Sequence, residues 1–172
     1  MISIGFMKAK RIWIIGANGS GKTTLAKKLS KKLKIKSYNL DDIYWARKWN
    51  KARDEKSIEK RLIKIVDKKS WIIEGVFSSW IERGIRKADL VILLDLPMPI
   101  ILWRLFLRHL KRGEDNLPQT WKSLLGMMRF STGYKRKNAR FLRHKELIGK
   151  HNLKFIVAKN KKQVEDLIGG LT

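Results

Sequence analysis

The sequence contains no cysteine and no long apolar run, and each absence excludes a class of protein. Without cysteine, the 172-residue chain has no disulfide frame and no thiolate metal cluster, which is compatible with a reducing cytosol. Its longest apolar run, around residues 90–94, is far shorter than the roughly 18 residues needed to cross a bilayer. We therefore expect a cytoplasmic protein without a transmembrane segment.

Acidic residues are also scarce. The chain has 15 Asp and Glu against 40 Lys and Arg, which gives a formal net charge of +25. Such a field attracts nucleotides, nucleic acids and anionic membranes alike, so it does not identify a partner. Most lysine runs lack interleaved aromatic residues, which favours a solvated surface over a platform for stacking bases. No helix-turn-helix or zinc-finger spacing is evident, and non-specific binding of nucleic acid stays open.

The remaining composition predicts one domain, spanning residues 1–172, with residues 1–9 as a leader. A hydrophobic content of 44% is enough for a single core. Apolar runs without polar alternation are typical of strands buried on both faces of a parallel sheet. The predicted strands are residues 11–15, 35–40, 71–73, 90–94 and 153–158, and the predicted helices between and after them are residues 23–33, 54–68, 79–87 and 161–168.

A complete phosphate-binding loop follows the first predicted strand and precedes a helix. Its sequence is Gly16-Ala17-Asn18-Gly19-Ser20-Gly21-Lys22-Thr23, with Thr24 next. The glycines allow the backbone to curl so that its N–H groups point inward, and the helix adds its positive dipole end. We expect these residues to bind ATP, with Lys22 on the β- and γ-phosphates and the Thr23 hydroxyl on Mg²⁺.

A long insertion, residues 97–150, interrupts the alternation of strands and helices. It begins with a helix that carries Arg104 and Arg108 four residues apart, passes through a breaker-rich stretch at residues 113–118, and resumes with helices. The last of these predicted helices is basic and contains Arg136, Arg140 and Arg143. Two interpretations remain open: a mobile lid over about residues 109–145, and an ordinary helical hairpin with charged faces.

Five segments together resemble a known family. The chain resembles the adenylate-kinase-related DNA topology modulation proteins, the FlaR-related group, in the phosphate-binding loop, Leu40-Asp41-Asp42-Ile43-Tyr44-Trp45, Trp71-Ile72-Ile73-Glu74-Gly75, the stretch from Ala88 to Pro97 and Trp103-Arg104. The resemblance implies a P-loop kinase fold, three-layer α/β/α, whose five parallel strands have the order 2-3-1-4-5. It also implies that Arg104 lies against the nucleotide base and Arg108 faces the phosphates.

Acidic residues follow three of the predicted strands, at the sheet edge where ligands bind. We expect Glu74 to orient metal-bound water, although such proteins often have an aspartate there. Asp41 is a candidate to contact metal-bound water or to accept a proton from an acceptor hydroxyl. Asp42 and Asp95 are predicted to cap helices instead.

Two functions are compatible with these residues. The first is an ATP-dependent phosphotransferase that moves the γ-phosphate to a small acceptor: a nucleotide, a nucleoside or another metabolite. Asp41, Tyr44 and Trp45, with Trp49, are candidates for its acceptor pocket, although core packing also explains aromatic side chains. The alternative is a nucleic-acid-associated NTPase or regulator that affects DNA topology.

Overall fold

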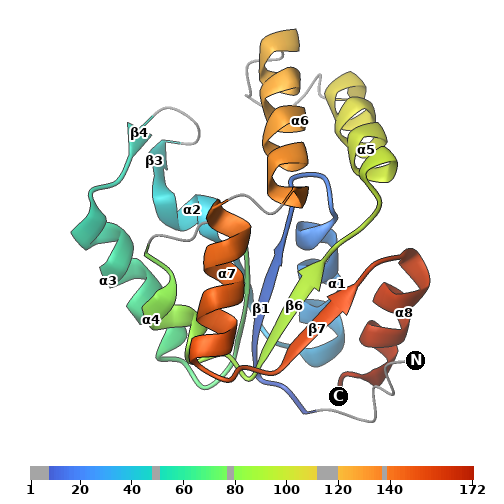
Figure 1. The fold of residues 1–172 in the computed structure, drawn as a ribbon. Helices are drawn as coiled ribbons and strands as arrows, with labels where there is room; N and C mark the ends of the chain where they lie inside the picture. Colours follow the sequence, from blue (N-terminus) through green and yellow to red (C-terminus); the bar gives the residue numbers. More distant parts are fainter. Residues whose placement is uncertain (1–7, 48–50, 77–79, 112–119, 137–138) are drawn as a thin grey trace.

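A parallel sheet between two layers of helices forms the body of the protein (Figure 1). The computed structural model describes residues 8–47, 51–76, 80–111, 120–136 and 139–172. The sheet has the order β2-β5-β1-β6-β7 and all its neighbouring strands are parallel. This is the predicted order 2-3-1-4-5 once two short additional strands are set aside. The strands are β1 Arg11–Gly16, β2 Ser37–Asn39, β5 Trp71–Glu74, β6 Leu90–Leu94 and β7 Phe155–Ala158.

The central strand β1 places alternate side chains in two cores, because successive side chains of a strand point to opposite faces. Ile12 and Ile14 pack with Leu25 and Leu29 of α1 (Lys22–Leu33), in a core that also includes Leu167 of α8 (Lys161–Gly170). Trp13 and Ile15 belong to the opposite core, which α3 (Glu55–Val66), α4 (Glu82–Ile85) and α7 (Ala139–Lys150) help to cover. Both faces of the sheet are therefore covered, as the uninterrupted apolar strands predict.

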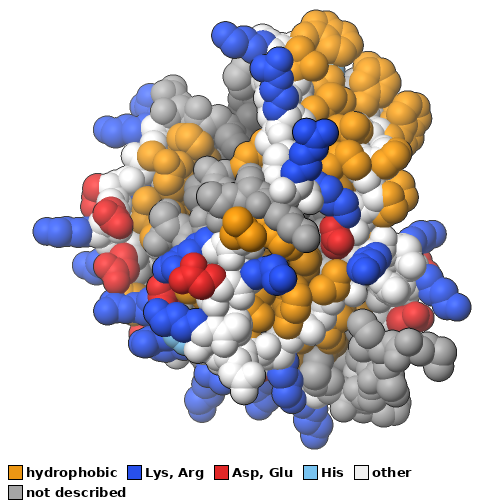
Figure 2. Space-filling model, viewed as in Figure 1, with side chains coloured by type: hydrophobic (Ala, Val, Ile, Leu, Met, Phe, Trp, Pro, Cys, Tyr) orange, Lys and Arg blue, Asp and Glu red, His pale blue; other side chains and the backbone are white. Residues whose placement is uncertain are grey.

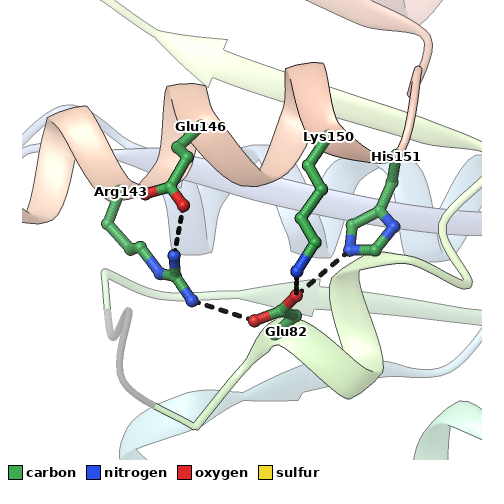
Figure 3. A network of polar contacts seen from close by, with 5 residues as sticks. All are labelled: Glu82, Arg143, Glu146, Lys150 and His151. Carbon is green, nitrogen blue, oxygen red and sulfur yellow. Dashed lines mark hydrogen bonds and ion pairs between the residues drawn. The ribbon is translucent and has the colours of Figure 1, made fainter.

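Helix α7 is joined to α4 by a network of charged side chains (Figure 3). Glu82 accepts from Arg143 Nη2 at 2.9 Å and from Lys150 Nζ at 2.6 Å, and His151 Nε2 lies 3.5 Å from the same carboxylate. Arg143 also donates to Glu146 on its own helix at 2.6 Å. Arg143 belongs to the segment predicted as a lid, and these contacts hold it against the body of the protein.

Helices α5 (Met98–Lys111) and α6 (Trp121–Lys135) rise beyond the carboxyl end of β1 (Figure 1). The predicted lid, about residues 109–145, contains the end of α5, all of α6 and the start of α7, and its residues 112–119 and 137–138 lie outside the described residues. The structure separates the three arginines that we expected in one helix, because α6 ends at Lys135 with Arg136 as its C-cap and α7 begins at Ala139. Movement of this segment stays a prediction.

Three local predictions differ from the structure. The strand predicted over residues 35–40 ends early, because the Asn39 side chain accepts from the Asp41 N–H at 2.7 Å and so begins helix α2 (Leu40–Tyr44). Asn39 is therefore the cap, and the prediction for Asp42 was wrong. The prediction for Asp95 was also wrong: α5 begins at Met98, and the Asp95 carboxylate contacts Lys135 Nζ of α6 instead.

Two further features complete the fold. The strands β3 (Trp45–Arg47) and β4 (Lys51–Ala52), which the sequence did not predict, form a short antiparallel pair after α2. Of the predicted leader, residues 1–7 lie outside the described residues, whereas Ala9 is buried in the core shared by α1 and α8. Within the part of the chain that the structure describes, no helix is both long and apolar enough to cross a membrane.

Candidate functional site

The loop between β1 and α1 has the backbone that its glycines predict. Gly16, Gly19 and Gly21 have φ angles of 152°, 81° and 95°, in the region that L side chains rarely adopt. A Cβ at Gly16 would also lie 2.8 Å from the Leu94 carbonyl oxygen, so both the φ angle and the lack of space require glycine there. The loop is closed by a hydrogen bond from the Ser20 N–H to the Ala17 carbonyl at 3.2 Å.

Lys22 is buried inside this loop, with 8% of its surface exposed. Its ammonium donates to the Ala17 carbonyl at 2.9 Å. Burial lowers the pKa of Lys22 to about 8, although the nearby carboxylates of Glu74 and Asp41 oppose this shift; Arg108 lowers the pKa further. The lysine is thus a poorly solvated cation, which a polyphosphate would stabilise.

Glu74 ends the neighbouring strand β5, opposite Ile14 of β1. The residue is 3% exposed, and its carboxylate accepts from the Thr23 hydroxyl at 2.8 Å. Burial raises the pKa of Glu74, while Lys22 and the Thr23 hydrogen bond oppose the shift. The structure therefore brings together three predicted residues from two segments of the chain: Lys22 and Thr23 at the start of α1, and Glu74 at the end of β5.

The hydroxyl of Thr23 and the carboxylate of Glu74 are hard oxygen ligands, the kind that Mg²⁺ binds. Their 2.8 Å contact shows that one small cation with its waters could reach both. Among the described residues, no three His, Cys, Asp or Glu side chains form a metal site on their own. The pair fits a magnesium ion that is bound chiefly by nucleotide phosphates and water, as P-loop proteins bind it.

Helix α2 carries the predicted acceptor residues Asp41 and Tyr44, and Trp45 follows it as the first residue of β3. Asp41 lies in the first turn of α2, and its negative charge acts to raise the pKa of Lys22 against the effect of burial and the pKa of Glu74 along with it, which indicates that the three groups lie near one another. Tyr44 and Trp45 are half-buried, and their rings meet edge to face at 4.8 Å. Arg53 donates to backbone carbonyls of α2, including those of Asp42 at 2.9 Å and Ile43 at 3.0 Å, and so fixes the end of the helix. The predicted Trp49 lies outside the described residues.

The two predicted arginines of α5 approach the loop from the other side. Arg104 Nη1 donates to the Ser20 carbonyl at 3.3 Å, so this arginine lies on the loop itself. Arg108 Nη2 lies 3.2 Å from the Met127 sulfur of α6, close enough to Lys22 to lower its pKa. The expected contacts of Arg104 with a base and of Arg108 with the phosphates stay predictions, whereas the Arg104 guanidinium does contact the phosphate-binding loop.

Sequence reasoning missed one residue at this site, Ser131 of α6. Ser131 is completely buried, and its one hydroxyl proton is shared between the Asn18 carbonyl of the loop, at 3.0 Å, and the Met127 carbonyl, at 2.8 Å. No motif singles out a serine in the middle of an amphipathic helix that lies 113 positions from its partner. A neighbouring hydroxyl, that of Ser20, is buried with no hydrogen-bond partner among the described residues.

Comparisons with known proteins agree with this geometry. The profile of the AAA domain family matches residues 12–122, which include the loop, Glu74 and both α5 arginines. The chain belongs to the AAA domain family. This AAA-domain protein is also 36% identical over 104 residues to the uncharacterized protein YqaC of Bacillus subtilis (strain 168). That match covers 60% of the chain and only 58% of the relative's length.

Among solved structures, the AAA-domain chain is similar to shikimate kinases at low sequence identity. The enzyme of Acinetobacter baumannii, in complex with shikimate, superposes with a TM-score of 0.55 at 17% identity, covering 93% of this chain and 89% of that one. The enzyme of Bacteroides thetaiotaomicron gives 0.55 at 15%, covering 94% and 95%. These matches establish a P-loop kinase-like fold. They do not bear on the narrower resemblance to DNA topology modulation proteins, which stays a hypothesis.

Proposed function

We propose that this protein is an ATP-dependent phosphotransferase that acts on a small hydroxylated or phosphorylated acceptor. The observation that carries the proposal is the convergence of Lys22, the Thr23–Glu74 pair and Arg104 on one loop at the carboxyl edge of the sheet. Phosphoryl transfer depends chiefly on positioning and on neutralising charge, and this set of side chains supplies both.

Each residue has a distinct role in the proposed reaction. The acceptor oxygen attacks the γ-phosphorus, the bond from that phosphorus to the β–γ bridging oxygen breaks, and the acceptor proton passes to the Asp41 carboxylate. Lys22 and Arg108 stabilise the charge on the transferred group and on the departing ADP, while Arg104 supports the loop from outside. Magnesium, held by Thr23 and through water by Glu74, neutralises phosphate charge when bound. Tyr44 and Trp45 form one wall of the acceptor pocket.

The test is an acceptor screen with a matched inactive variant. ADP formation is measured with ATP and Mg²⁺ against nucleoside monophosphates, nucleosides and hydroxylated metabolites, including shikimate, which one of the similar structures binds. We expect at least one acceptor to raise ADP formation, and Lys22→Ala to abolish that increase while its circular dichroism matches wild type. Equal turnover by the two folded proteins would disprove the proposal.

A second candidate function, a nucleic-acid-associated NTPase, is favoured by one observation, the net charge of +25. In that case duplex or single-stranded DNA, rather than a small acceptor, would stimulate ATP hydrolysis. DNA is therefore included in the same screen.

A further inference from the structure

We propose that Ser131 is a positioning residue that orients one peptide of the phosphate-binding loop for phosphate binding. The inference deepens the proposed function and rests on it, since it concerns the nucleotide site of the same reaction. It assigns part of that site to helix α6, outside the loop motif and beyond the matched residues 12–122.

The structural basis is a hydrogen bond from α6 to the back of the loop. Ser131 is fully buried, and its hydroxyl oxygen lies 3.0 Å from the Asn18 carbonyl oxygen and 2.8 Å from the Met127 carbonyl oxygen. The single hydroxyl proton is therefore shared between these two acceptors. Met127 lies one helical turn before Ser131, and its sulfur contacts Arg108. One face of α6 therefore contacts both the loop and an arginine of the site.

Fixing the Asn18 carbonyl also fixes the Gly19 N–H. In a planar trans peptide the C=O and the next N–H point in opposite directions. A carbonyl held toward α6 therefore turns the Gly19 N–H away from α6, to the concave side of the loop where phosphate binds. Gly19, at φ 81°, can adopt several backbone conformations, so without a restraint this peptide could rotate.

Helix α5 restrains the next two residues of the loop in the same way. A Cβ at Gly19 would lie 2.9 Å from Leu105 Cγ, so the backbone there is pressed against α5. The Ser20 carbonyl accepts from Arg104 at 3.3 Å, which turns the Gly21 N–H in the opposite direction. Three consecutive loop residues are thus held from outside by α5 and α6.

The chain offers a closely matched control, Thr132. Its hydroxyl donates to the carbonyl four residues earlier, that of Met128, at 2.9 Å, as the Ser131 hydroxyl does to Met127. The described contacts of that hydroxyl are with Met128 and Met98, and not with the loop. A comparison of Ser131→Ala with Thr132→Val therefore isolates the hydrogen bond to Asn18.

The experiment measures binding of ATP and of inorganic pyrophosphate to the full chain by calorimetry. Pyrophosphate tests the loop without a base. We expect Ser131→Ala to weaken both ligands about three- to tenfold, the range for one lost hydrogen bond, and Ser131→Thr, which keeps the hydroxyl, to restore affinity. Thr132→Val should change either affinity less than about twofold. Adenosine, which lacks phosphates, should bind all four proteins equally.

Several outcomes would overturn the inference. Unchanged affinity in folded Ser131→Ala would do so, as would an equal loss in Thr132→Val, because the second result would show a general effect of α6 packing. If Ser131→Ala does not fold, Ser131→Cys, of nearly the same size and a weaker donor, must show the phosphate-specific loss. Lys22→Ala separates the two proposals: if it loses ATP and Ser131→Ala does not, only the inference fails. If wild type binds neither ligand, both fail.

Discussion

Lys22 and Glu74 attract each other, yet burial dominates the ionisation of both. The pKa of the lysine is lowered and that of the glutamate is raised, so each shifts toward its neutral form. Neither charge is well stabilised in the ligand-free protein. Opposed pKa shifts of this kind at one site are typical of groups that bind a ligand or take part in catalysis, rather than of groups that stabilise the fold.

Replacing Lys22 by methionine should therefore stabilise the ligand-free protein while abolishing phosphoryl transfer. The pKa of Lys22 is lowered from 10.5 to about 8, which means that the folded state disfavours the charged lysine. At pH 7 this shift limits the increase in the free energy of unfolding of Lys22→Met to ~3 kcal/mol. Since the unfolded chain binds the extra proton between these two values, wild type gains stability as pH rises from 8 to 10.5. The advantage of Lys22→Met should shrink across that range.

Urea unfolding of the two proteins at pH 7 and pH 10 measures this effect. The control is Lys28→Met, an exposed position on the same helix, which should change the free energy of unfolding by less than about 0.5 kcal/mol at either pH. An advantage of Lys22→Met that does not depend on pH would contradict the assigned cause.

Glu74→Gln tests the metal-organising role with little change of shape, because the amide can still accept from Thr23. We expect turnover at saturating ATP to fall about 100-fold or more, with a higher Mg²⁺ requirement. ATP affinity in EDTA should change only a few-fold, since the phosphate-binding groups are intact. The measurement is turnover as a function of Mg²⁺ concentration. Glu59→Gln, which removes an exposed carboxylate paired with Arg83, is the control. An unchanged Mg²⁺ requirement would assign the role to Asp41.

At the scale of elements, the helices of the insertion after β6 contact different parts of the protein. Helix α7 is joined to α4 through Glu82, whereas α5 and α6 contact each other and the phosphate-binding loop. A lid that includes α7 would have to break the Glu82 network. Movement of α5 and α6 alone would instead change the support of the loop.

The Glu82 network gives a prediction for the attachment of α7. Hydrogen bonding from Lys150, with Arg143 nearby, lowers the pKa of Glu82. Its stabilising effect is therefore complete above pH 4.5, the ordinary value, and is lost as pH falls through the lowered pKa. Glu82→Gln should melt a few degrees below wild type at pH 7 and low salt, with a smaller difference in acid and at high salt.

Thermal melts at pH 7 and pH 3.5, each with and without 1 M salt, measure these differences. Glu165→Gln, which removes an exposed pair with Lys161, is the control and should melt like wild type. A Glu82→Gln difference that persists unchanged in acid would mean that packing, not charge, attaches α7.

At the scale of the whole molecule, Figure 2 shows basic side chains spread over much of one face with only scattered acidic ones, while hydrophobic side chains gather at its upper right. A surface of this kind binds polyanions through counterion release, which weakens steeply with salt. The arginines of α7 are not uniformly available for such contacts, since Arg143 is bonded to Glu82 and Glu146. We therefore expect the basic surface to attract nucleic acid through a non-specific electrostatic field, rather than through a structured binding site.

Binding of duplex DNA should accordingly be weak and largely lost between low salt and about 0.15 M, and DNA should leave ATP turnover unchanged. The measurement is the ATPase rate with and without DNA at that salt. About tenfold stimulation, equivalent to ~1.4 kcal/mol of coupling, that disappears when Arg136, Arg140 and Arg143 are neutralised together would instead support the NTPase alternative.

How far the sequence predicts this molecule depends on whether a feature is local. The loop, the five strands and their order follow from runs of residues and from the resemblance, and the structure confirms them. Asp42 and Asp95 were misassigned because capping depends on competing partners, Asn39 in one case and Lys135 in the other. Ser131 could not be found at all, since its role arises only when α6 packs on a loop more than 100 positions away.

The central position of β1 has a consequence for the time course of folding. β1 is synthesised before both of its neighbours in the sheet, since β5 and β6 come much later in the chain. At about 5–20 residues per second, Ile12 waits several seconds before Ile72 of β5, the earlier of its two partners, exists. During that interval an apolar strand remains unpaired on the ribosome. This period of synthesis is when the chain most needs protection from aggregation.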